Sequence, residues 1–480
     1  MIKRTGFHAP VSRRAFMAST ASAAALLLPR QSIASSGSQP AAPRAQAQNE
    51  PAVPGDWRMW YLASADALRP PAPGAATRDE IDEVIRVQSA AGPEVTEAIM
   101  RWGMGSAPIA WSNLAIELFT EFGMGAGIPQ SRPMAILHTA MHDAAIAAWD
   151  AQLAHARPGP AATDSRITPA GVVDAEQPSF PSAHAAVAGA ASVVLTYLFT
   201  DAAEGRFDQL AAEATESRLA AGAAFRSDLD AGLQIGYAVA ELAIARAMDD
   251  GSAQTWDPAT MPSGPGVWKP TPPMFVDAPA FPLGGSRTPW VLTGGDQFRP
   301  APPPEHGSAA WRSELAQVRH IVANRDFEQN RAAVWWGTSS PIVHFTRWAQ
   351  EQMARTGATL PEAARILADL HVAIDDTLIG IWDAKYTYWT SRPITDDEEI
   401  VTSVPTPPYP AYPAGYPAAM SAGATVMGHY FPDVSVDMDQ RAWEASCSRL
   451  WAGIHYGIDN DAGLLLGRRV GRLVAALDSA

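Results

Sequence analysis

Three basic residues and one histidine near the C-terminal end are the side chains best suited to chemistry. Lys385 precedes Arg392 by seven positions, and Arg449 precedes His455 by six. Guanidinium and ammonium groups that converge on one pocket bind a tetrahedral oxyanion, because they offer forked donors and a compact charge. An imidazole beside such an anion can attack its central atom or ligate it. We therefore predict an oxyanion pocket with His455 as its reacting residue.

A Pro-rich turn at residues 409–416 lies between these two segments and precedes an Ala-rich helical segment. Gly415 stands where the first N–H groups of that helix would face an anion. Taken singly, the basic residues also suit surface ion pairs, which are common for exposed charges. The acids available for such pairs are Asp396, Asp397, Glu398 and Glu444. The pocket and the ion pairs are alternative interpretations of the same residues.

Helices must position these residues, because apolar side chains recur with the 3.6-residue period of a helix over long segments. Strand signals are sparse, and residues 251–304 are rich in Pro and Gly without periodicity. The clearest helical segments are Met134 to Trp149, Ala185 to Leu198, Leu233 to Met248, Pro361 to Trp382 and Gly463 to Leu477. We predict an all-α fold with a long structured connection between helical bundles.

The chain also repeats itself at an interval of about 232 residues. Trp, Asp, Ser-Arg and Gly positions recur in the same order, which chance matches between Ala-rich helices do not readily produce. Matched pairs include Asp143 with Asp376, Trp149 with Trp382, Ser217 with Ser448, Arg218 with Arg449 and Asp228 with Asp459. The repeat predicts two related four-helix bundles that arose by internal duplication.

Four regions follow from these patterns. Arg13 and Arg14 precede an Ala/Leu run that is shorter than the ~20 apolar residues needed to span a bilayer, which is typical of a twin-arginine export signal. The regions are an export signal and linker at 1–48, a first, degenerate bundle at 55–250, a Pro/Gly-rich connection at 251–310, and a second bundle with the oxyanion site at 311–480. We expect a periplasmic or secreted protein.

The composition excludes several classes of function. The formal net charge of -15 argues against nucleic acids and anionic membranes as partners, because both would repel the average surface. The single cysteine, Cys447, cannot form an internal disulfide or a thiolate metal cluster. We expect a small-molecule substrate, no nucleic-acid partner and no stable membrane insertion, and we leave a homodimer open.

In combination, these residues resemble the signature of the vanadium haloperoxidase and type 2 phosphatidic acid phosphatase superfamily. Its parts correspond to Lys385 with Arg392-Pro393, a Pro-x-Gly-x turn at 413–416, and Ser448-Arg449 with His455 and Asp459. The resemblance covers residues from about 268 to 477 and is nearest to the bacterial haloperoxidase-like branch, which has twin helical bundles.

The resemblance implies a role for each matched residue. The oxyanion would be bound by Lys385, Arg392, Gly415 and Arg449. His455 would ligate vanadate or, as in phosphatases, attack phosphorus. The cofactor implied is vanadate, and phosphate or diphosphate would occupy the same site. Asp376 and Asp459 would support the pocket from outside it, and we expect the Asp375-Asp376 pair to orient an arginine rather than to bind magnesium.

The sequence departs from the family in the middle motif, which usually reads Pro-Ser-Gly-His. Its Ser donates to the oxyanion and its His acts as acid or base, whereas here Ala414 and Tyr416 stand in those places. Replacing imidazole by phenol raises the reference pKa from about 6.5 to about 10. Tyr416 is therefore a catalytic candidate that would donate a proton or a hydrogen bond, but it is a poor base at neutral pH.

The first repeat shows the complementary loss. It keeps Ser182 and His184 of a middle motif, but Gln152 replaces the lysine and Ala224 stands at the position of the reacting histidine. This half is either a decayed second site or the donor of Ser182 and His184 to a relocated pocket. A third interpretation, which we favour here, is that His184 caps the helix that begins beside it.

Three functions are consistent with these residues. The leading hypothesis is a haloperoxidase-like enzyme that binds vanadate and oxidises halide with hydrogen peroxide, acting on a halide or on an apolar organic substrate. The second is a phosphatase or a diphosphate-processing enzyme, including a prenyl diphosphate lyase or cyclase, that uses the same pocket. The third is a catalytically degenerate scaffold that binds an anion, because neither repeat carries a complete set of site residues.

Overall fold

The computed structural model describes residues 57–479, with the exception of residues 104 and 175. The predicted export signal and linker at 1–48 lie outside the described residues. Regular structure in the described part consists of helices, with one isolated β-bridge between Val267 and Thr390. The all-α prediction is confirmed. None of the helices described is long and apolar enough to cross a membrane.

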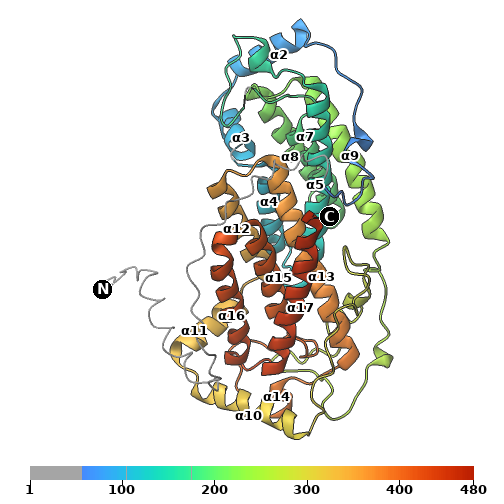
Figure 1. Cartoon of the computed structure of the whole chain (residues 1–480), viewed down its shortest axis with the longest axis vertical. Coiled ribbons are helices and arrows are strands. Elements are labelled where there is room, and N and C mark those ends of the chain that lie inside the picture. Colours follow the sequence, from blue (N-terminus) through green and yellow to red (C-terminus); the bar gives the residue numbers. More distant parts are fainter. Residues whose placement is uncertain (1–56, 104, 175, 480) are drawn as a thin grey trace, which may run out of the picture. The chain divides into compact units, whose positions relative to one another are not determined.

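The described helices fall into two groups (Figure 1). The first comprises η4 (Ala65–Leu68), α2 (Arg78–Ser89), α3 (Pro93–Gly103), α4 (Ala107–Glu121), α5 (Ile128–His155), α6 (Pro160–Thr163), α7 (Ala183–Leu198), α8 (Arg206–Ala220) and α9 (Arg226–Met248). The connection contains η5 (Pro258–Thr260) and η6 (Gly284–Ser286). The second comprises α10 (Ala309–Asn324), α11 (Phe327–Gly337), α12 (Pro341–Thr356), α13 (Leu360–Tyr388), α14 (Pro393–Asp396), α15 (Gly415–Tyr430), η7 (Pro432–Val434), α16 (Ser435–Trp451), α17 (Gly457–Ala475) and η8 (Ala476–Ser479). All five segments predicted from periodicity lie in helices.

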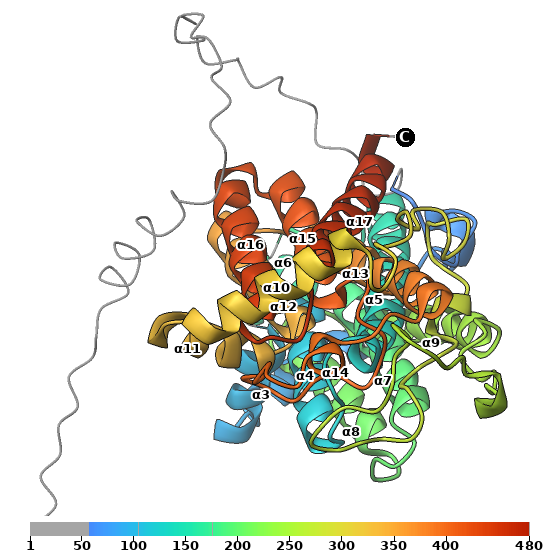
Figure 2. The same cartoon turned by 90° about the horizontal axis from the view of Figure 1, so that it is seen from below.

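Helices α5 and α13 pack against each other where the two groups meet (Figures 1 and 2). Their contact includes two stacked imidazoles, because the ring centroids of His138 and His371 lie 4.5 Å apart. Each Nε2 atom pairs with a hydroxyl group of a neighbouring helix, that of Ser112 on α4 at 3.1 Å and that of Thr346 on α12 at 3.2 Å. One apolar core contains residues of both groups. The two predicted bundles therefore lie in one compact unit.

Glycines let one pair of helices in each bundle approach closely. Gly232 of α9 lies against the carbonyl oxygen of Ser182, and Gly463 of α17 lies against that of Ala414. A Cβ atom at either glycine would collide with this backbone. In the second bundle the close contact fixes the start of α15 beside the start of α17, where two parts of the predicted site lie.

Equivalent carboxylates hold equivalent loops in the two bundles. Asp143 of α5 accepts backbone N–H bonds from residues 60–62, and Asp376 of α13 accepts them from residues 290–292. The matched contacts show that the sequence repeat is also a structural correspondence between these positions. Its origin by duplication stays an interpretation.

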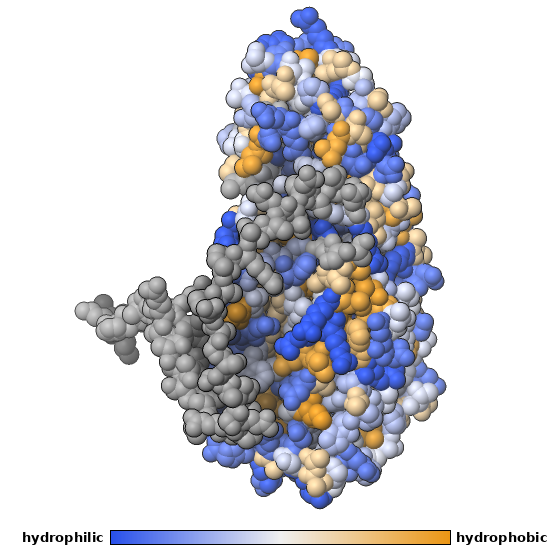
Figure 3. All heavy atoms as spheres, in the orientation of Figure 1, coloured by the Kyte–Doolittle hydropathy of each residue, from blue (hydrophilic) through white to orange (hydrophobic). Residues whose placement is uncertain are grey.

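The Pro/Gly-rich connection packs onto the second bundle. Gly285 and Gly295 lie directly against Asp383 of α13, and Arg299 pairs with the same carboxylate at 2.6 Å. These contacts bring residues 302–306 to the end of α13, close to the predicted pocket. On the face shown in Figure 3, hydrophobic residues form separate groups among hydrophilic ones, as is usual for a protein surface.

Candidate oxyanion site

Five elements of the second bundle carry the predicted pocket residues. Lys385 lies in the last turn of α13, Arg392 is the N-cap residue of α14, Gly415 begins α15, Arg449 lies in the last turn of α16, and His455 lies just before α17. All five residues are buried. The predicted residues therefore lie at helix ends or in the loop beside one.

Lys385 ties the end of α13 to the Pro-rich turn. Its Nζ atom donates to the carbonyl oxygens of Pro410 at 2.7 Å and Ala411 at 2.9 Å. It also lies 5.1 Å from the ring centroid of Tyr409. Burial, together with the charge of Arg392, lowers the pKa of Lys385 well below its usual value. Two of the three ammonium donors are therefore used by backbone groups of the described chain.

Arg392 is fully buried and contacts His455. Its Nε atom donates to the Tyr409 carbonyl at 2.9 Å, and its Nη1 atom lies 2.8 Å from the Ile454 carbonyl and 3.0 Å from His455 Nε2. The Nη2 atom is buried without a hydrogen-bond partner in the part of the chain that the structure describes. An orphaned buried donor costs about 1–3 kcal/mol. Burial lowers the pKa of Arg392 to about 10, so the group stays protonated at neutral pH.

His455 is held by a carboxylate on one side and faces an arginine on the other. Its Nδ1 atom lies 2.9 Å from Asp459 Oδ2, which also accepts the Tyr456 backbone N–H at 3.0 Å. Burial and the nearby cations lower the pKa of His455, and burial raises that of Asp459 to about 7. With the proton on Nδ1, the Nε2 lone pair accepts a hydrogen bond from Arg392 Nη1. A nucleophile or a ligand requires this unprotonated Nε2, and the bond from Arg392 would break when Nε2 meets the central atom of an oxyanion.

Arg449 is held by Ser448 and lies near Tyr416. Its Nε and Nη2 atoms donate to Ser448 Oγ at 3.0 and 2.9 Å, and its guanidinium carbon lies 4.6 Å from the ring centroid of Tyr416. Gly415 is the first residue of α15, so its N–H has no acceptor within the helix. The guanidinium and this N–H add donors to those of Arg392 and Lys385.

Tyr416 is present at the site but is not a base. Its hydroxyl pairs with Ser339 Oγ at 3.1 Å, and its ring meets the edge of Trp336 at 6.2 Å between centroids. Burial raises the pKa of Tyr416 to about 12, and the charge of Arg449 only partly offsets this effect. The phenol therefore stays protonated at neutral pH and acts as a hydrogen-bond donor.

The alternative of surface ion pairs is wrong. Lys385 and Arg392 are 0% exposed and Arg449 is 5% exposed, and none of them forms a salt bridge with a described residue. Three of the four acids have other partners, namely Tyr456 for Asp396, Arg319 for Asp397 and Trp336 for Glu444. Three buried cations that form no ion pair with a described acid are more consistent with an anion site.

Asp376 does not lie in this pocket. It precedes Lys385 by nine residues on α13, which is about 13 Å along the helix axis, and its carboxylate holds residues 290–292. Its neighbour Asp375 does orient an arginine, because Arg287 Nη2 donates to it at 2.8 Å. That arginine belongs to the connection, so the expected support of the pocket by Asp376 is wrong, whereas that by Asp459 agrees with the geometry.

The arginine of the first repeat forms an ion pair instead. Arg157 Nη1 donates to Asp228 Oδ1 at 2.6 Å, and its Nη2 atom lies 3.2 Å from Glu80 Oε2. Gln152 donates to the Pro181 carbonyl at 2.8 Å, much as Lys385 does in the second bundle. The cation is thus neutralised by two acids of the chain itself.

Ser182 and His184 also belong to the first bundle only. Ser182 is the N-cap residue of α7, and its Oγ accepts the Ala185 N–H at 3.3 Å. The expectation that His184 caps this helix is therefore wrong. Burial, together with the charge of Arg218 in the same bundle, lowers the pKa of His184 to about 3. These contacts give no support to a relocated composite site.

Two contacts of the site were not predicted from the sequence. Ser339, between α11 and α12, pairs with Tyr416, and Tyr409 places its ring near both Lys385 and Arg392. Tyr409 opens the Pro-rich turn, so its position was a usable signal. Ser339 lies 77 residues from its partner and carries no signal of its own.

The model of the PAP2 superfamily matches residues 134–250 of the chain. The resemblance to this superfamily is confirmed. The matched residues belong to the first bundle and its Ser182 to His184 segment, not to the pocket of the second bundle. No curated protein matches the chain in sequence.

Solved structures show the same fold. The chain is similar to a bacterial vanadium-dependent iodoperoxidase with 23% identity and a TM-score of 0.55, over 84% of this chain and 97% of that one. It is also similar to the apo form of a bacterial vanadium-dependent chloroperoxidase, with 15% identity and a TM-score of 0.55 over 74% of this chain and 94% of that one. The holo form gives 15% identity and a TM-score of 0.53 over 73% and 90%. The fold is therefore that of these bacterial haloperoxidases.

Proposed function

We propose that the second bundle binds vanadate and that the protein oxidises a halide with hydrogen peroxide. One observation carries this proposal: the unprotonated Nε2 of His455 contacts Arg392, whose Nη2 atom is buried without a partner among the described residues. An incoming oxyanion would supply the acceptor that Arg392 lacks and the central atom that an imidazole ligates. The fold similarity to vanadium-dependent peroxidases supports vanadate as that oxyanion.

The residues present fit vanadate with one deficit. Lys385, Arg392 and Arg449 would neutralise its charge, and the Gly415 N–H would add a donor from the start of α15. Ala414 is fully buried and offers no hydroxyl, so one donor of the family pattern is missing. The three cations outweigh this loss, because a hydrogen bond to a charged group contributes about 1.5–3 kcal/mol.

Bound vanadate would supply Lewis-acid activation of peroxide. The protein's own part is to bind, orient and hold protons. Asp459 keeps the imidazole proton on Nδ1 of His455, which leaves Nε2 unprotonated. Tyr416 stays protonated and can only donate, so any base for peroxide must come from water or from the oxyanion rather than from this phenol.

Calorimetric titration of orthovanadate into the mature protein tests binding first. We expect saturable binding that is lost in His455→Ala and retained in the matched control His184→Ala. Oxidation of iodide, bromide and chloride with hydrogen peroxide is then assayed on the vanadate-loaded protein. Absence of vanadate binding contradicts both the site and the reaction, whereas binding without turnover of any halide contradicts the reaction and favours an anion-binding scaffold.

Phosphoryl transfer is a second candidate, and the PAP2 match together with the His455–Asp459 pair favours it. An imidazole held through Nδ1 can attack phosphorus through Nε2, and the buried cations would stabilise the charge that develops on phosphate oxygens. Release of phosphate from phosphatidate or from a prenyl diphosphate tests this candidate. In that case vanadate inhibits turnover instead of supporting it.

A further inference from the structure

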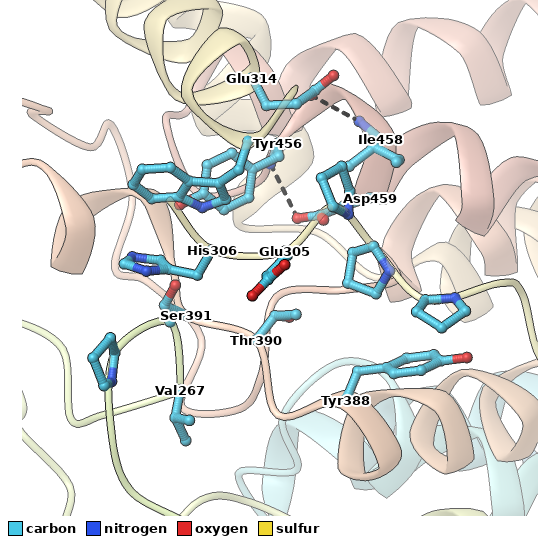
Figure 4. A pocket seen from close by; sticks show the side chains of 16 residues that line it. Val267, Glu305, His306, Glu314, Tyr388, Thr390, Ser391, Tyr456, Ile458 and Asp459 are labelled. Atoms are coloured by element: carbon cyan, nitrogen blue, oxygen red, sulfur yellow. Dashed lines mark hydrogen bonds between the residues drawn. The ribbon is translucent and has the colours of Figure 1, made fainter. Parts of the chain in front are cut away.

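A cavity of about 490 Å³ lies beside the oxyanion site (Figure 4). Its walls come from the connection, from α10, from the end of α13 and from the start of α17. This volume is within the range of pockets that hold small organic molecules. Asp459 lines the cavity and is also the residue that holds His455, so the cavity adjoins the oxyanion pocket through one carboxylate.

Three acids line the cavity, and no Lys or Arg is among its lining residues. The acids are Glu305, Glu314 and Asp459. Asp459 is 1% exposed and uses Oδ2 for its bonds to His455 and to the Tyr456 backbone, whereas Oδ1 accepts no hydrogen bond from the residues that the structure describes. The charges of Lys385 and Arg392 act on Asp459 from the neighbouring oxyanion pocket, so the negative charge of the cavity comes chiefly from Glu305 and Glu314. Carboxylates in a partly enclosed cavity attract a cation.

The first bundle shows what kind of cation fits this pair of acids. Glu80 and Asp228 correspond to Glu314 and Asp459, because Glu80 contacts Ser227 just before Asp228, and Glu314 accepts the Ile458 N–H just before Asp459. In the first bundle the guanidinium of Arg157 bridges both acids, at 3.2 Å and 2.6 Å. It uses Oδ1 of Asp228, the counterpart of the oxygen that has no partner in Asp459.

Aromatic side chains complete a site for an organic cation rather than a metal ion. Trp311, Tyr388 and Tyr456 line the cavity, and aromatic faces attract organic cations. Among the described residues, no three His, Cys, Asp or Glu side chains are placed to hold a metal ion. The three carboxylates are therefore not grouped to share one metal ion.

We propose that this cavity binds a small organic cation, a guanidinium, amidinium or ammonium compound with an aromatic or apolar part. The charged group lies between Glu314 and the Oδ1 atom of Asp459, as the Arg157 guanidinium does between the equivalent acids. Glu305 adds charge at the entrance from the connection, and the rings of Trp311 and Tyr388 cover the apolar part. This site does not depend on which reaction the oxyanion pocket performs.

Calorimetric titration of benzamidine into the vanadate-free protein tests the proposal, with benzamide as the neutral isostere. We expect saturable binding of benzamidine and binding of benzamide that is at least about tenfold weaker, because charge-assisted bonds are lost. Glu314→Gln is expected to weaken benzamidine binding by about tenfold or more. The control Glu328→Gln, whose side chain is 51% exposed on α11, is expected to leave binding unchanged.

Glu305→Gln is a second test variant, since Glu305 is exposed and its substitution does not disturb the core. Thermal unfolding of each variant checks that it is folded before titration. Equal binding of benzamide and benzamidine, no binding of benzamidine, or unchanged binding in both folded Gln variants would overturn the proposal. Vanadate is absent throughout, so a failure here is distinct from a failure of the proposed oxyanion site.

Discussion

The two bundles share backbone contacts at a pair of equivalent aspartates, but the side chains that these aspartates bind differ. Asp228 accepts the Phe225 N–H through Oδ2 and binds Arg157 through Oδ1. Asp459 accepts the Tyr456 N–H and the His455 imidazole through Oδ2. Even the next contact is shared, since the carbonyls of both aspartates accept an N–H from the start of a neighbouring helix at 2.8 Å. The divergence therefore lies in side chains, not in the frame.

One position explains much of this divergence. Ala224 stands where His455 lies, so the first bundle has no imidazole for its aspartate and arginine to contact. There the arginine closes an ion pair with two acids, whereas Arg392 contacts the imidazole and keeps an unpartnered Nη2. An oxyanion site needs donors that the protein has not already neutralised. The PAP2 match covers the first bundle, whereas the buried donors without an ion-pair partner lie in the second.

The reacting histidine should give the largest difference between the halves. We expect His455→Ala to reduce turnover by about 10³-fold or more, because it removes the group that ligates or attacks the central atom. His184→Ala is expected to keep turnover within about twofold, since it lies in the half whose cation is neutralised. Steady-state kinetics with the substrate identified by the halide and phosphate assays checks both. A comparable loss of turnover in His184→Ala would instead support a composite site that uses residues of both bundles.

Substitution of the two arginines should affect different properties, vanadate binding in one case and stability in the other. Arg392→Gln is expected to weaken vanadate binding by about 10²-fold, because charge-assisted bonds to the oxyanion are lost. Arg157→Gln should leave vanadate binding unchanged but lower the free energy of unfolding by about 3–5 kcal/mol, because Asp228 is left buried without its cation. Calorimetry and urea unfolding measure the two quantities. If Arg157→Gln weakens vanadate binding as much as Arg392→Gln does, the inferred difference between the two bundles is wrong.

The sequence was sufficient to predict where the site residues gather. Lys385, Arg392 and Arg449 lie at the ends of helices whose order and period are readable, and His455 follows from its spacing to Arg449. Which donors stay free was not predictable. That depends on long-range contacts such as Arg157 with Glu80, which lie 77 residues apart and need the folded chain to meet.

Helices with mixed surfaces were also harder to predict than the central ones. The Ala-rich α5 and α13 are buried on most sides and stand out in the sequence as long apolar segments, whereas α10 and α16 mix charged and apolar residues and have no such segment. The prediction that Asp376 supports the pocket also failed. Its position is matched in the repeat because the aspartate holds a loop, not because it contacts the pocket.

The stacked histidines between the bundles provide a test in which the halves should behave alike. Burial lowers the pKa of His138 and lowers that of His371 to about 3, an effect that Asp375 only partly offsets. Both imidazoles are therefore neutral when folded and bind protons when unfolded below about pH 6.5. The contribution of each histidine to stability is complete above about pH 6.5. Below this pH, the free energy of unfolding falls by about 1.4 kcal/mol per pH unit for each histidine, until the pH reaches the folded pKa.

We expect His138→Gln and His371→Gln each to reduce the loss of unfolding free energy between pH 6.5 and pH 5 by about 2 kcal/mol. Glutamine keeps a partner for Ser112 or Thr346 but does not titrate. Urea unfolding at several pH values measures the slope. Exposed His320→Gln is the control and should keep the wild-type slope. An effect from only one of the two buried positions would show that the halves differ here as well.

The smallest expected effect concerns Tyr416, where the second bundle departs from the pattern of the superfamily that the chain resembles. Tyr416→Phe removes one neutral hydrogen-bond donor, and such a bond contributes about 0.5–1.5 kcal/mol, so turnover should fall by roughly two- to tenfold. Ser339→Ala should have a similar or smaller effect, because it frees the phenol without removing it. Neither variant should change the acidic limb of the pH–rate profile, since Tyr416 has a pKa of about 12 and is protonated throughout that range. A shift of that limb in Tyr416→Phe would mean that the phenol titrates during turnover, and the second bundle would then retain the acid–base function that its missing histidine provides elsewhere.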